Sequence, residues 1–215
     1  MSHGLFISFE GIDGVGKSTQ ADLMENYLAS KGLKVVRTLE PGGTELGQEI
    51  RHLLLHRKGE VSARSEALLY AADRAHHVAS KILPALEKGQ VVITDRYLDS
   101  SVAYQGAGRE LDLTEVRNLS LWAVNNLLPD LTVLLDLDAQ LAAKRRGQTG
   151  EAPDRLEREK IEFFEAARNS YLDLAKAEPN RIFVVDANQA PEKIWEAIVV
   201  RLDQILESKG LCVPF

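Results

Sequence analysis

The chain has 215 residues, a net charge of -6 at pH 7, 45% hydrophobic residues and 27% charged residues. This size and composition predict one soluble α/β domain over 1–215, and the acidic balance argues against a nucleic-acid-binding face. No leader segment and no apolar run of the roughly 20 residues that span a membrane are visible, and a single cysteine, Cys212, excludes an internal disulfide, so we expect a cytoplasmic protein.

A glycine-rich segment follows the first predicted strand, 5–9. Residues 11–18 read Gly-Ile-Asp-Gly-Val-Gly-Lys-Ser, the pattern of a phosphate-binding loop, and a helix predicted over 17–30 gives the strand–loop–helix context that the pattern requires. Glycines let successive backbone N–H groups surround an anion, and the helix N-terminus adds its positive dipole end. We therefore expect a bound nucleoside triphosphate, with Lys17 at its phosphates and the Ser18 hydroxyl on Mg²⁺.

Strands and helices alternate along the rest of the chain. Apolar, β-prone runs predict strands over 34–39, 91–95, 131–136 and 181–186. Helical spacing predicts helices over 44–55, where Thr44 is the expected cap, and over 62–87, 114–126, 139–146, 156–177 and 191–208. The alternation predicts an α/β fold of the P-loop NTPase type, a doubly wound sheet of five parallel strands with helices on both faces and ligands at the carboxyl ends of its strands.

Polar residues follow the predicted strand 91–95. The strand closes on Asp95, an arrangement that places a carboxylate near a bound metal ion, and Arg96 comes directly after it. A guanidinium there can fork between two phosphate groups, although a surface ion pair is the simpler alternative. Ser100 to Gly106 then bring hydroxyls, an amide and a phenol, in what we predict to be one turn, to the rim of the same cleft.

A basic group follows the fourth predicted strand. Lys144, Arg145 and Arg146, with Arg155 beyond the flexible segment 147–153, form either a solvated helix face or a mobile basic lid over about 139–156. Residues 11–18 contain no arginine, and a transferring phosphoryl group needs positive charge around it. The lid is therefore the favoured interpretation.

The predicted helix 62–87 carries a further candidate pair. Tyr70 and Arg74 lie four residues apart on one helix face, where they either read a base or are a core tyrosine and a surface arginine. Asp73 and the adjacent His76 and His77 are expected to be structural or solvent-facing, because neighbouring histidines on a helix do not converge on one metal.

Together these segments resemble the thymidylate kinase family over essentially the whole chain. Four stretches carry the resemblance: Phe-Glu-Gly-Ile-Asp-Gly-Val-Gly-Lys-Ser-Thr at 9–19, Glu-Pro-Gly-Gly-Thr at 40–44, Asp-Arg-Tyr with Asp-Ser-Ser over 95–101, and Ala-Tyr-Gln-Gly at 103–106. The resemblance implies transfer of the ATP γ-phosphoryl group to dTMP with Mg²⁺, for dTTP synthesis, by a homodimer that binds neither nucleic acid nor membrane. Alanine- and leucine-rich helices before Glu87 and after Leu113 are where an interface would form.

The resemblance also implies roles for individual residues. The ATP-binding set is Gly11, Ile12, Asp13, Gly14, Val15, Gly16, Lys17, Ser18 and Thr19 with Arg145 and Arg155. Metal binding falls to Ser18, Asp13 and Asp95, and catalysis to Lys17, Asp13, Arg96 and a lid arginine, for which we choose Arg146. The dTMP site comprises Asp13 near the 3′-hydroxyl, Pro41 at the floor, Arg51 at the phosphate, Tyr70 stacked on thymine, Arg74 and Ser101 at its polar edge, Arg96 between donor and acceptor, Tyr104 at the 2′ position, and Gln105.

Two features depart from the family pattern. Leu39 stands where such sequences commonly carry an arginine, with Arg37 as the candidate for compensation. The segment 147–153 lengthens the lid, which leaves its catalytic arginine a choice among Lys144, Arg145, Arg146 and Arg155.

Three rival functions share the phosphate-binding loop. A GTP-dependent switch needs an Asn-Lys-x-Asp motif, which this sequence lacks. Another small-molecule kinase or ligase would lack the pattern over 95–105, and a nucleotide-binding interaction module would not need the filled set of catalytic positions.

Overall fold

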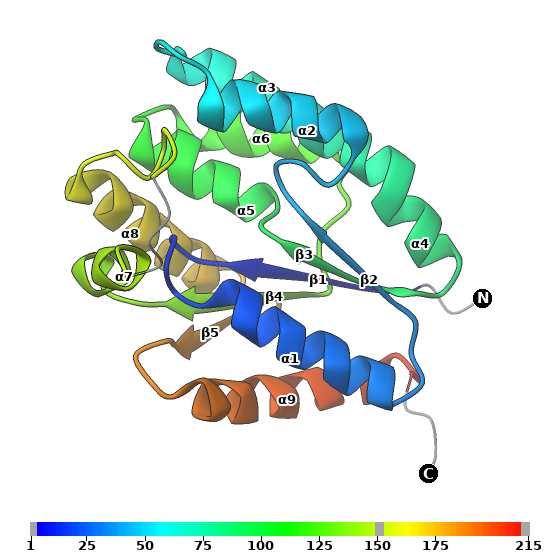
Figure 1. The fold of residues 1–215 in the computed structure, drawn as a ribbon. Helices are drawn as coiled ribbons and strands as arrows, with labels where there is room; N and C mark the ends of the chain where they lie inside the picture. The colour runs from blue at the N-terminus through cyan, green and yellow to red at the C-terminus, as the bar shows by residue number, and fades with distance from the viewer. Residues whose placement is uncertain (1–3, 149–152, 212–215) are drawn as a thin grey trace.

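The computed structural model describes residues 4–148 and 153–211, and Cys212 therefore lies outside the described residues. Its strands are β1 (Leu5–Glu10), β2 (Val35–Leu39), β3 (Val91–Asp95), β4 (Leu131–Asp136) and β5 (Ile182–Asp186). They form one parallel sheet in the order β2-β3-β1-β4-β5 (Figure 1). The predicted parallel sheet of five strands is confirmed, with strand ends that agree to within one residue.

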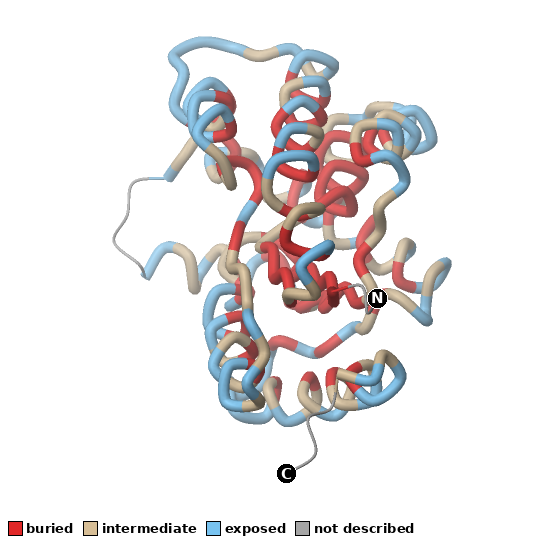
Figure 2. Tube along the Cα trace, turned by 90° about the vertical axis from the view of Figure 1, so that its right-hand side faces the viewer, coloured by how far each residue is buried: buried red, intermediate tan, exposed pale blue. Residues whose placement is uncertain are grey.

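Helices cover both faces of this sheet. Helices α1 (Lys17–Ser30) and α9 (Pro191–Ser208) lie on one face, whereas α4 (Leu83–Glu87), α5 (Leu98–Ser101) and α8 (Ile161–Ala177) lie on the other (Figure 1). Helices α2 (Glu45–Arg51), α3 (Ala63–His77) and α6 (Leu113–Ala123) pack outside that second layer, and α7 (Ala139–Arg146) lies next to α8. Buried residues gather on the strands and on the helix sides that face them (Figure 2). Since both faces are covered, the strands read as continuous apolar runs.

Two π-helical segments in the described part of the chain extend or interrupt predicted helices. The helix expected over 44–55 is α2 continued by η1 (His52–His56), with the Thr44 hydroxyl accepting from the Gly47 N–H at 2.9 Å as the expected cap. The helix expected over 62–87 is α3, η2 (Val78–Ile82) and α4 in succession. The helix expected over 156–177 begins only at Ile161.

The turn predicted over 100–106 is wrong. These residues are helical, in α5 and the following η3 (Val102–Gly108). The glycines there serve close packing, because a Cβ on Gly106 would lie 2.6 Å from Leu113 and one on Gly108 would lie 2.6 Å from Phe163. These two glycines thus let α6 and α8 approach this helix.

No helix in the described part of the chain is long and apolar enough to cross a membrane.

Candidate active site

The phosphate-binding loop connects β1 to α1 in the predicted place. Gly11, Gly14 and Gly16 have φ values of 128°, 90° and 97°, which side chains other than glycine rarely adopt. A Cβ on Gly14 would also lie 2.4 Å from the carbonyl oxygen of Ala142, so this glycine lets α7 pack directly on the loop. Lys17 is nearly buried, and its Nζ donates to the carbonyls of Gly11 and Ile12 at 3.2 and 3.3 Å. The loop thus presents the lysine and the N-terminus of α1 to a ligand.

Two cavities open at the carboxyl ends of the strands and share four residues. The first, called here the acceptor cavity, is lined by Asp13, Glu40, Pro41, Arg51, Leu55, Tyr70, Arg96, Ser100, Tyr104, Gln105, Asp154 and Leu156. The second, the donor cavity, is lined by Asp13, Gly14, Gly16, Lys17, Ser18, Thr19, Leu39, Glu40, Arg51, Asp95, Arg96, Arg145, Arg146 and Glu157. The shared residues are Asp13, Glu40, Arg51 and Arg96, which therefore mark the junction between the cavities.

An ion pair occupies this junction. Arg96 Nη2 donates to Asp13 Oδ1 at 2.6 Å and to the Tyr104 hydroxyl at 3.0 Å. The Arg96 guanidinium also lies 4.8 Å from the centroid of the Tyr104 ring. Burial alone would raise the pKa of Asp13, but the charges of Arg96 and Lys17 hold it below its ordinary value. Asp13 is thus ionised at neutral pH and orients Arg96 toward both cavities.

The predicted metal ligands differ in how free they are to bind. Asp95 Oδ1 is buried and has no hydrogen-bond partner among the described residues, and Ser18 is exposed at the start of α1. Both line the donor cavity, and a carboxylate and a hydroxyl oxygen are ligands that suit Mg²⁺. Both Asp13 oxygens are engaged, by Arg96 and by the Tyr104 hydroxyl at 3.3 Å. Asp95 and Ser18 therefore fit a metal ion better than Asp13 does.

The basic residues of the predicted lid lie in two places. Arg145 and Arg146 line the donor cavity from the end of α7, with Arg146 stacked 4.7 Å from the centroid of the Phe164 ring. Arg155 lies elsewhere, because it donates to the carbonyl oxygen of Leu54 at 2.7 Å and forms an ion pair with Glu66. The structure thus brings Arg145 and Arg146 to the phosphate-binding loop but not Arg155, and residues 149–152 of the lid lie outside the described residues.

Most of the predicted dTMP residues line the acceptor cavity. Tyr70, on α3, is 8% exposed and forms a wall of it. Arg51 ends α2, and its Nη1 donates to the Pro41 carbonyl oxygen at 2.9 Å, which fixes the guanidinium beside the cavity floor. The Gln105 amide donates to Glu66 at 2.9 Å. These contacts hold the polar groups of the cavity in place before any ligand binds.

Arg74 and Ser101 lie behind this wall rather than on it. Neither lines the cavity, and the Arg74 guanidinium donates to Glu40 Oε2 at 2.6 Å, to the Ser101 hydroxyl at 3.1 Å and to the Tyr97 carbonyl oxygen at 3.2 Å. Glu40 also contacts His77 at 2.9 Å, so that histidine is structural, as expected. In this conformation Arg74 supports Glu40 at the junction, and its predicted contact with a base stays a prediction.

The sequence interpretation missed residues that only the tertiary structure brings to the site. Tyr171 on α8 and Glu10 at the end of β1 lie next to Arg96, and Asp154 and Leu156 form one side of the acceptor cavity. Glu66, fully buried on α3, contacts Gln105, Arg109 and Arg155. A glutamate inside an alanine- and leucine-rich helix, on its buried side, was the one signal available for Glu66.

Arg37 does not take the place of the missing arginine at position 39. Its guanidinium donates to Asp22 at 3.3 Å and lies 3.6 Å from Glu25, both on α1, and it lines neither cavity. Leu39 itself lines the donor cavity and is 38% exposed. The rim of the donor cavity therefore carries an apolar side chain at this position.

Comparison with known proteins gives concordant matches over most of the chain. The thymidylate kinase family model matches residues 9–198. A thymidylate kinase of Leifsonia xyli subsp. xyli is 62% identical over 200 residues, covering 93% of this chain and 95% of that protein. One of Clavibacter michiganensis subsp. michiganensis is 57% identical over 203 residues, covering 94% and 96%. The crystal structure of thymidylate kinase from Ehrlichia chaffeensis superposes with a TM-score of 0.76 at 32% identity, covering 93% of this chain and 99% of that one.

Proposed function

The chain belongs to the thymidylate kinase family and phosphorylates dTMP, and from this premise we propose that it transfers the γ-phosphoryl group of ATP, with Mg²⁺, in the synthesis of dTTP in the cytoplasm. The observation that carries the proposal is the junction, where Arg96 and Asp13 line both cavities. ATP would occupy the donor cavity over the phosphate-binding loop, and dTMP would occupy the acceptor cavity beside Tyr70. Membership of this family also rules out the GTP-dependent switch, the other kinases and the interaction module considered above.

The residues at the junction supply alignment and positive charge. A phosphate monoester is already ionised near neutral pH, so dTMP attacks without a strong general base. Arg96 would bridge the two nucleotides, Lys17 would bind the β- and γ-phosphates, and Arg146 or Arg145 would add charge from α7. Catalysis then consists mainly of holding the two phosphates in line while cations neutralise the developing charge.

Mg²⁺ fits the donor cavity on the evidence of Asp95. One oxygen of this carboxylate is buried without a partner in the described part of the chain, and Ser18 adds a hydroxyl on the same cavity. No group of three or more acidic, histidine or cysteine side chains in the described residues forms a complete metal cage, which suits an ion that shares its coordination with substrate phosphates. When bound there, Mg²⁺ would neutralise phosphate charge.

Recognition of the acceptor relies on Tyr70, Tyr104 and Gln105. Tyr70 offers a ring for the base, and Tyr104 lies between Arg96 and Asp13, where it would crowd a ribose 2′-hydroxyl. Thymine differs from uracil by one methyl group, worth roughly 1–3 kcal/mol in an apolar pocket. We therefore expect dUMP to be a weaker acceptor that is still phosphorylated.

The exposed faces of α3 and α6 support the proposed homodimer. Leu68, Leu113 and Trp122 are 57%, 47% and 81% exposed, beside a groove between the two helices. Arg64 and Glu115 line that groove and lie 3.6 Å apart, so the face offers both charges to a second copy. Leu68→Glu is expected to give a monomer in light scattering, whereas Val200→Glu, at an equally exposed position on α9, leaves the dimer intact.

The test of the proposed function measures ADP release with ATP and Mg²⁺ for dTMP, dUMP, dGMP and dCMP. We expect dTMP to be used best and dUMP to follow, and Arg96→Ala to lower kcat by about 10³-fold or more because the charge at the junction is lost. Arg201→Ala, on α9 and outside both cavities, is the matched control. Equal use of dTMP by Arg96→Ala would refute the assigned mechanism.

A further inference from the structure

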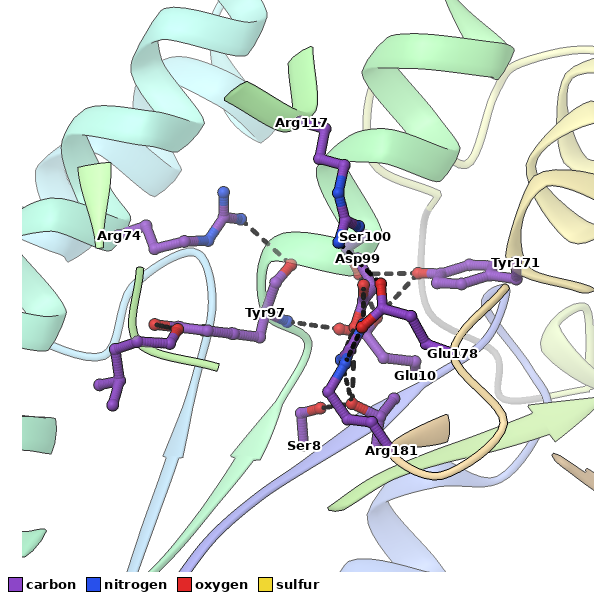
Figure 3. A network of polar contacts seen from close by, with 12 residues as sticks. Ser8, Glu10, Arg74, Tyr97, Asp99, Ser100, Arg117, Tyr171, Glu178 and Arg181 are labelled. Atoms are coloured by element: carbon purple, nitrogen blue, oxygen red, sulfur yellow. Dashed lines mark hydrogen bonds and ion pairs between the residues drawn. The ribbon is translucent and has the colours of Figure 1, made fainter. Parts of the chain in front are cut away.

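Behind the Arg96 guanidinium lies a carboxyl group that lines neither cavity. Glu10 ends β1 and has no exposed surface. Its Oε1 accepts a hydrogen bond from the Tyr97 N–H at 2.7 Å, and its Oε2 accepts from the Ser100 hydroxyl at 2.6 Å and the Tyr171 hydroxyl at 2.9 Å (Figure 3). The transfer step described above does not use this group, and a glutamate is rarely buried completely unless other groups pair with it.

The same two hydroxyls contact Arg96. Its Nη1 donates to Ser100 Oγ at 3.1 Å and to Tyr171 Oη at 3.3 Å. A guanidinium only donates, so each hydroxyl accepts from Arg96 with a lone pair and keeps its own hydrogen for another oxygen. The hydrogen bonds therefore run in one direction, from Arg96 through Ser100 and Tyr171 to Glu10.

The two nitrogens at the end of Arg96 thus have separate tasks. Nη2 faces Asp13 and Tyr104 at the junction, whereas Nη1 is held from behind by the two hydroxyls. The backbone of Arg96 has a φ of 69°, in the left-handed region where side chains other than glycine are uncommon. A strained backbone persists only where surrounding contacts hold it, and here the Arg96 N–H donates to the Phe9 carbonyl oxygen and the Thr94 hydroxyl donates to the Arg96 carbonyl oxygen, both at 2.9 Å.

Rigid elements hold both hydroxyls. Ser100 lies on α5, where the neighbouring Asp99 accepts from Arg181 at 2.6 and 2.9 Å in an ion pair that is 1% and 10% exposed (Figure 3). Tyr171 lies on α8, and its ring centroid is 6.3 Å from that of Tyr104. The core of the protein therefore sets the positions of the hydroxyls before any nucleotide binds.

The protonation of Glu10 is consistent with this arrangement. Burial, and next the charge of Asp99, raises the pKa of Glu10 to about 7, against the hydrogen bond from Ser100 and the charge of Arg96. Glu10 Oε2, Ser100 Oγ and Tyr171 Oη all lie within 2.9 Å of one another but share only two hydroxyl hydrogens. Both of these hydrogens point to Glu10 Oε2, so an uncharged side chain of the same shape that keeps an acceptor oxygen there suits this position.

We propose that Glu10 and Tyr171 are positioning residues that, with Ser100, hold the Arg96 guanidinium at the junction in its reactive direction. Neither group touches a nucleotide, and each acts through Arg96. This inference rests on the proposed role of Arg96 at the transferred phosphate.

The main test compares two buried tyrosines of which only one contacts Arg96. Tyr171→Phe removes a hydroxyl bonded to Arg96 and Glu10, whereas Tyr97→Phe removes one that donates to the Leu127 carbonyl oxygen at 3.2 Å. We expect Tyr171→Phe to lower kcat about tenfold with both KM values within about twofold, because one hydrogen bond to a charged group is lost from the aligned state. Tyr97→Phe should keep its kcat at a similar melting temperature.

A second pair tests Glu10 without relying on one fold-sensitive variant. Glu10→Gln keeps the shape and an acceptor oxygen and should retain most of kcat, whereas Glu10→Ala should lose about tenfold. The ¹⁵N signal of the Arg96 side chain should broaden in Tyr171→Phe and not in Tyr97→Phe. Normal kcat in Tyr171→Phe, or an equal loss in Tyr97→Phe, overturns the proposal if Arg96→Ala is inactive. An active Arg96→Ala instead refutes the proposed function on which it rests.

Discussion

The donor and acceptor cavities differ in how the chain builds them. One contiguous loop and the end of α7 supply most of the donor cavity, and its Ser18 and Thr19 are exposed to a ligand. The acceptor cavity draws on the β2–α2 turn, on α3, α5 and η3, and on Asp154 and Leu156 at the end of the predicted lid. Its polar groups are held by other protein groups, as Glu66 holds Gln105. The donor side therefore follows from a local motif, whereas the acceptor side depends on contacts between distant segments.

The largest expected effect comes from removing the lysine of the phosphate-binding loop, which should abolish the function of the donor cavity and leave dTMP binding in the acceptor cavity intact. Lys17→Ala should lower kcat about 10³-fold, because the positive charge that the lysine places beside the transferred phosphate is lost. The rise in melting temperature on adding dTMP alone should persist, since no acceptor-cavity group is changed. Lys176→Ala, at an exposed position where the lysine pairs with Asp173, is the control. Loss of dTMP binding in Lys17→Ala would show that the cavities are not built independently.

The opposite result is expected at Glu66, on the acceptor side. Although burial alone would raise the pKa of Glu66, hydrogen bonds from Arg109, Gln105 and Arg155 hold it below its ordinary value. Glu66→Ala removes the buried carboxylate that pairs with Arg109 and Arg155, although Arg109 keeps its ion pair with Glu159. It should therefore destabilise the fold by about 4 kcal/mol and raise KM for dTMP more than KM for ATP.

Chemical denaturation measures the expected loss of stability in Glu66→Ala, and steady-state kinetics on the same samples measure the expected rise in KM for dTMP. Glu196→Ala removes an exposed partner of Lys193 and should change stability by less than about 1 kcal/mol. A loss of stability with an unchanged KM for dTMP would restrict Glu66 to a structural role.

The same contrast explains what the sequence could predict. Apolar, β-prone runs and the turn residues between them indicated all five strands, and the loop at 11–18 indicated the donor site and the helix that follows it. The strand order, the helical conformation of 98–108 and the position of Arg155 depend on packing between distant segments, which no local pattern records. Glu10 directly follows the predicted strand 5–9, but its partner Tyr171 lies 161 residues further along the chain, so no local pattern relates the two.

The burial of Glu10 makes stability depend on pH. Burial raises its pKa from 4.5 to about 7, so the folded state binds this proton more tightly than the unfolded state. Its stability contribution is therefore greatest below pH 4.5 and declines by roughly 3 kcal/mol as the pH rises through 7. Glu10→Gln has no such proton. As the pH rises through this range, its melting temperature should therefore increase relative to that of the unmodified chain. Parallel melting curves for the two proteins would contradict the buried acid.

The smallest effect is expected at the rim of the donor cavity. Leu39 lines that cavity and is 38% exposed, and a side chain there reaches solvent beside the phosphate-binding loop. Leu39→Arg adds a mobile positive charge near the ATP phosphates and should lower KM for ATP two- to threefold, about 0.5 kcal/mol, because an exposed charge is well screened. Leu39→Gln introduces a long polar side chain without the charge, so its KM for ATP should match that of the unmodified chain. KM for dTMP should stay unchanged in both variants. The gain should vanish in 0.5 M salt, roughly the range where exposed charges no longer interact. A gain that survives high salt would instead mean a direct contact between the new arginine and the nucleotide, which would make position 39 part of the donor site rather than its rim.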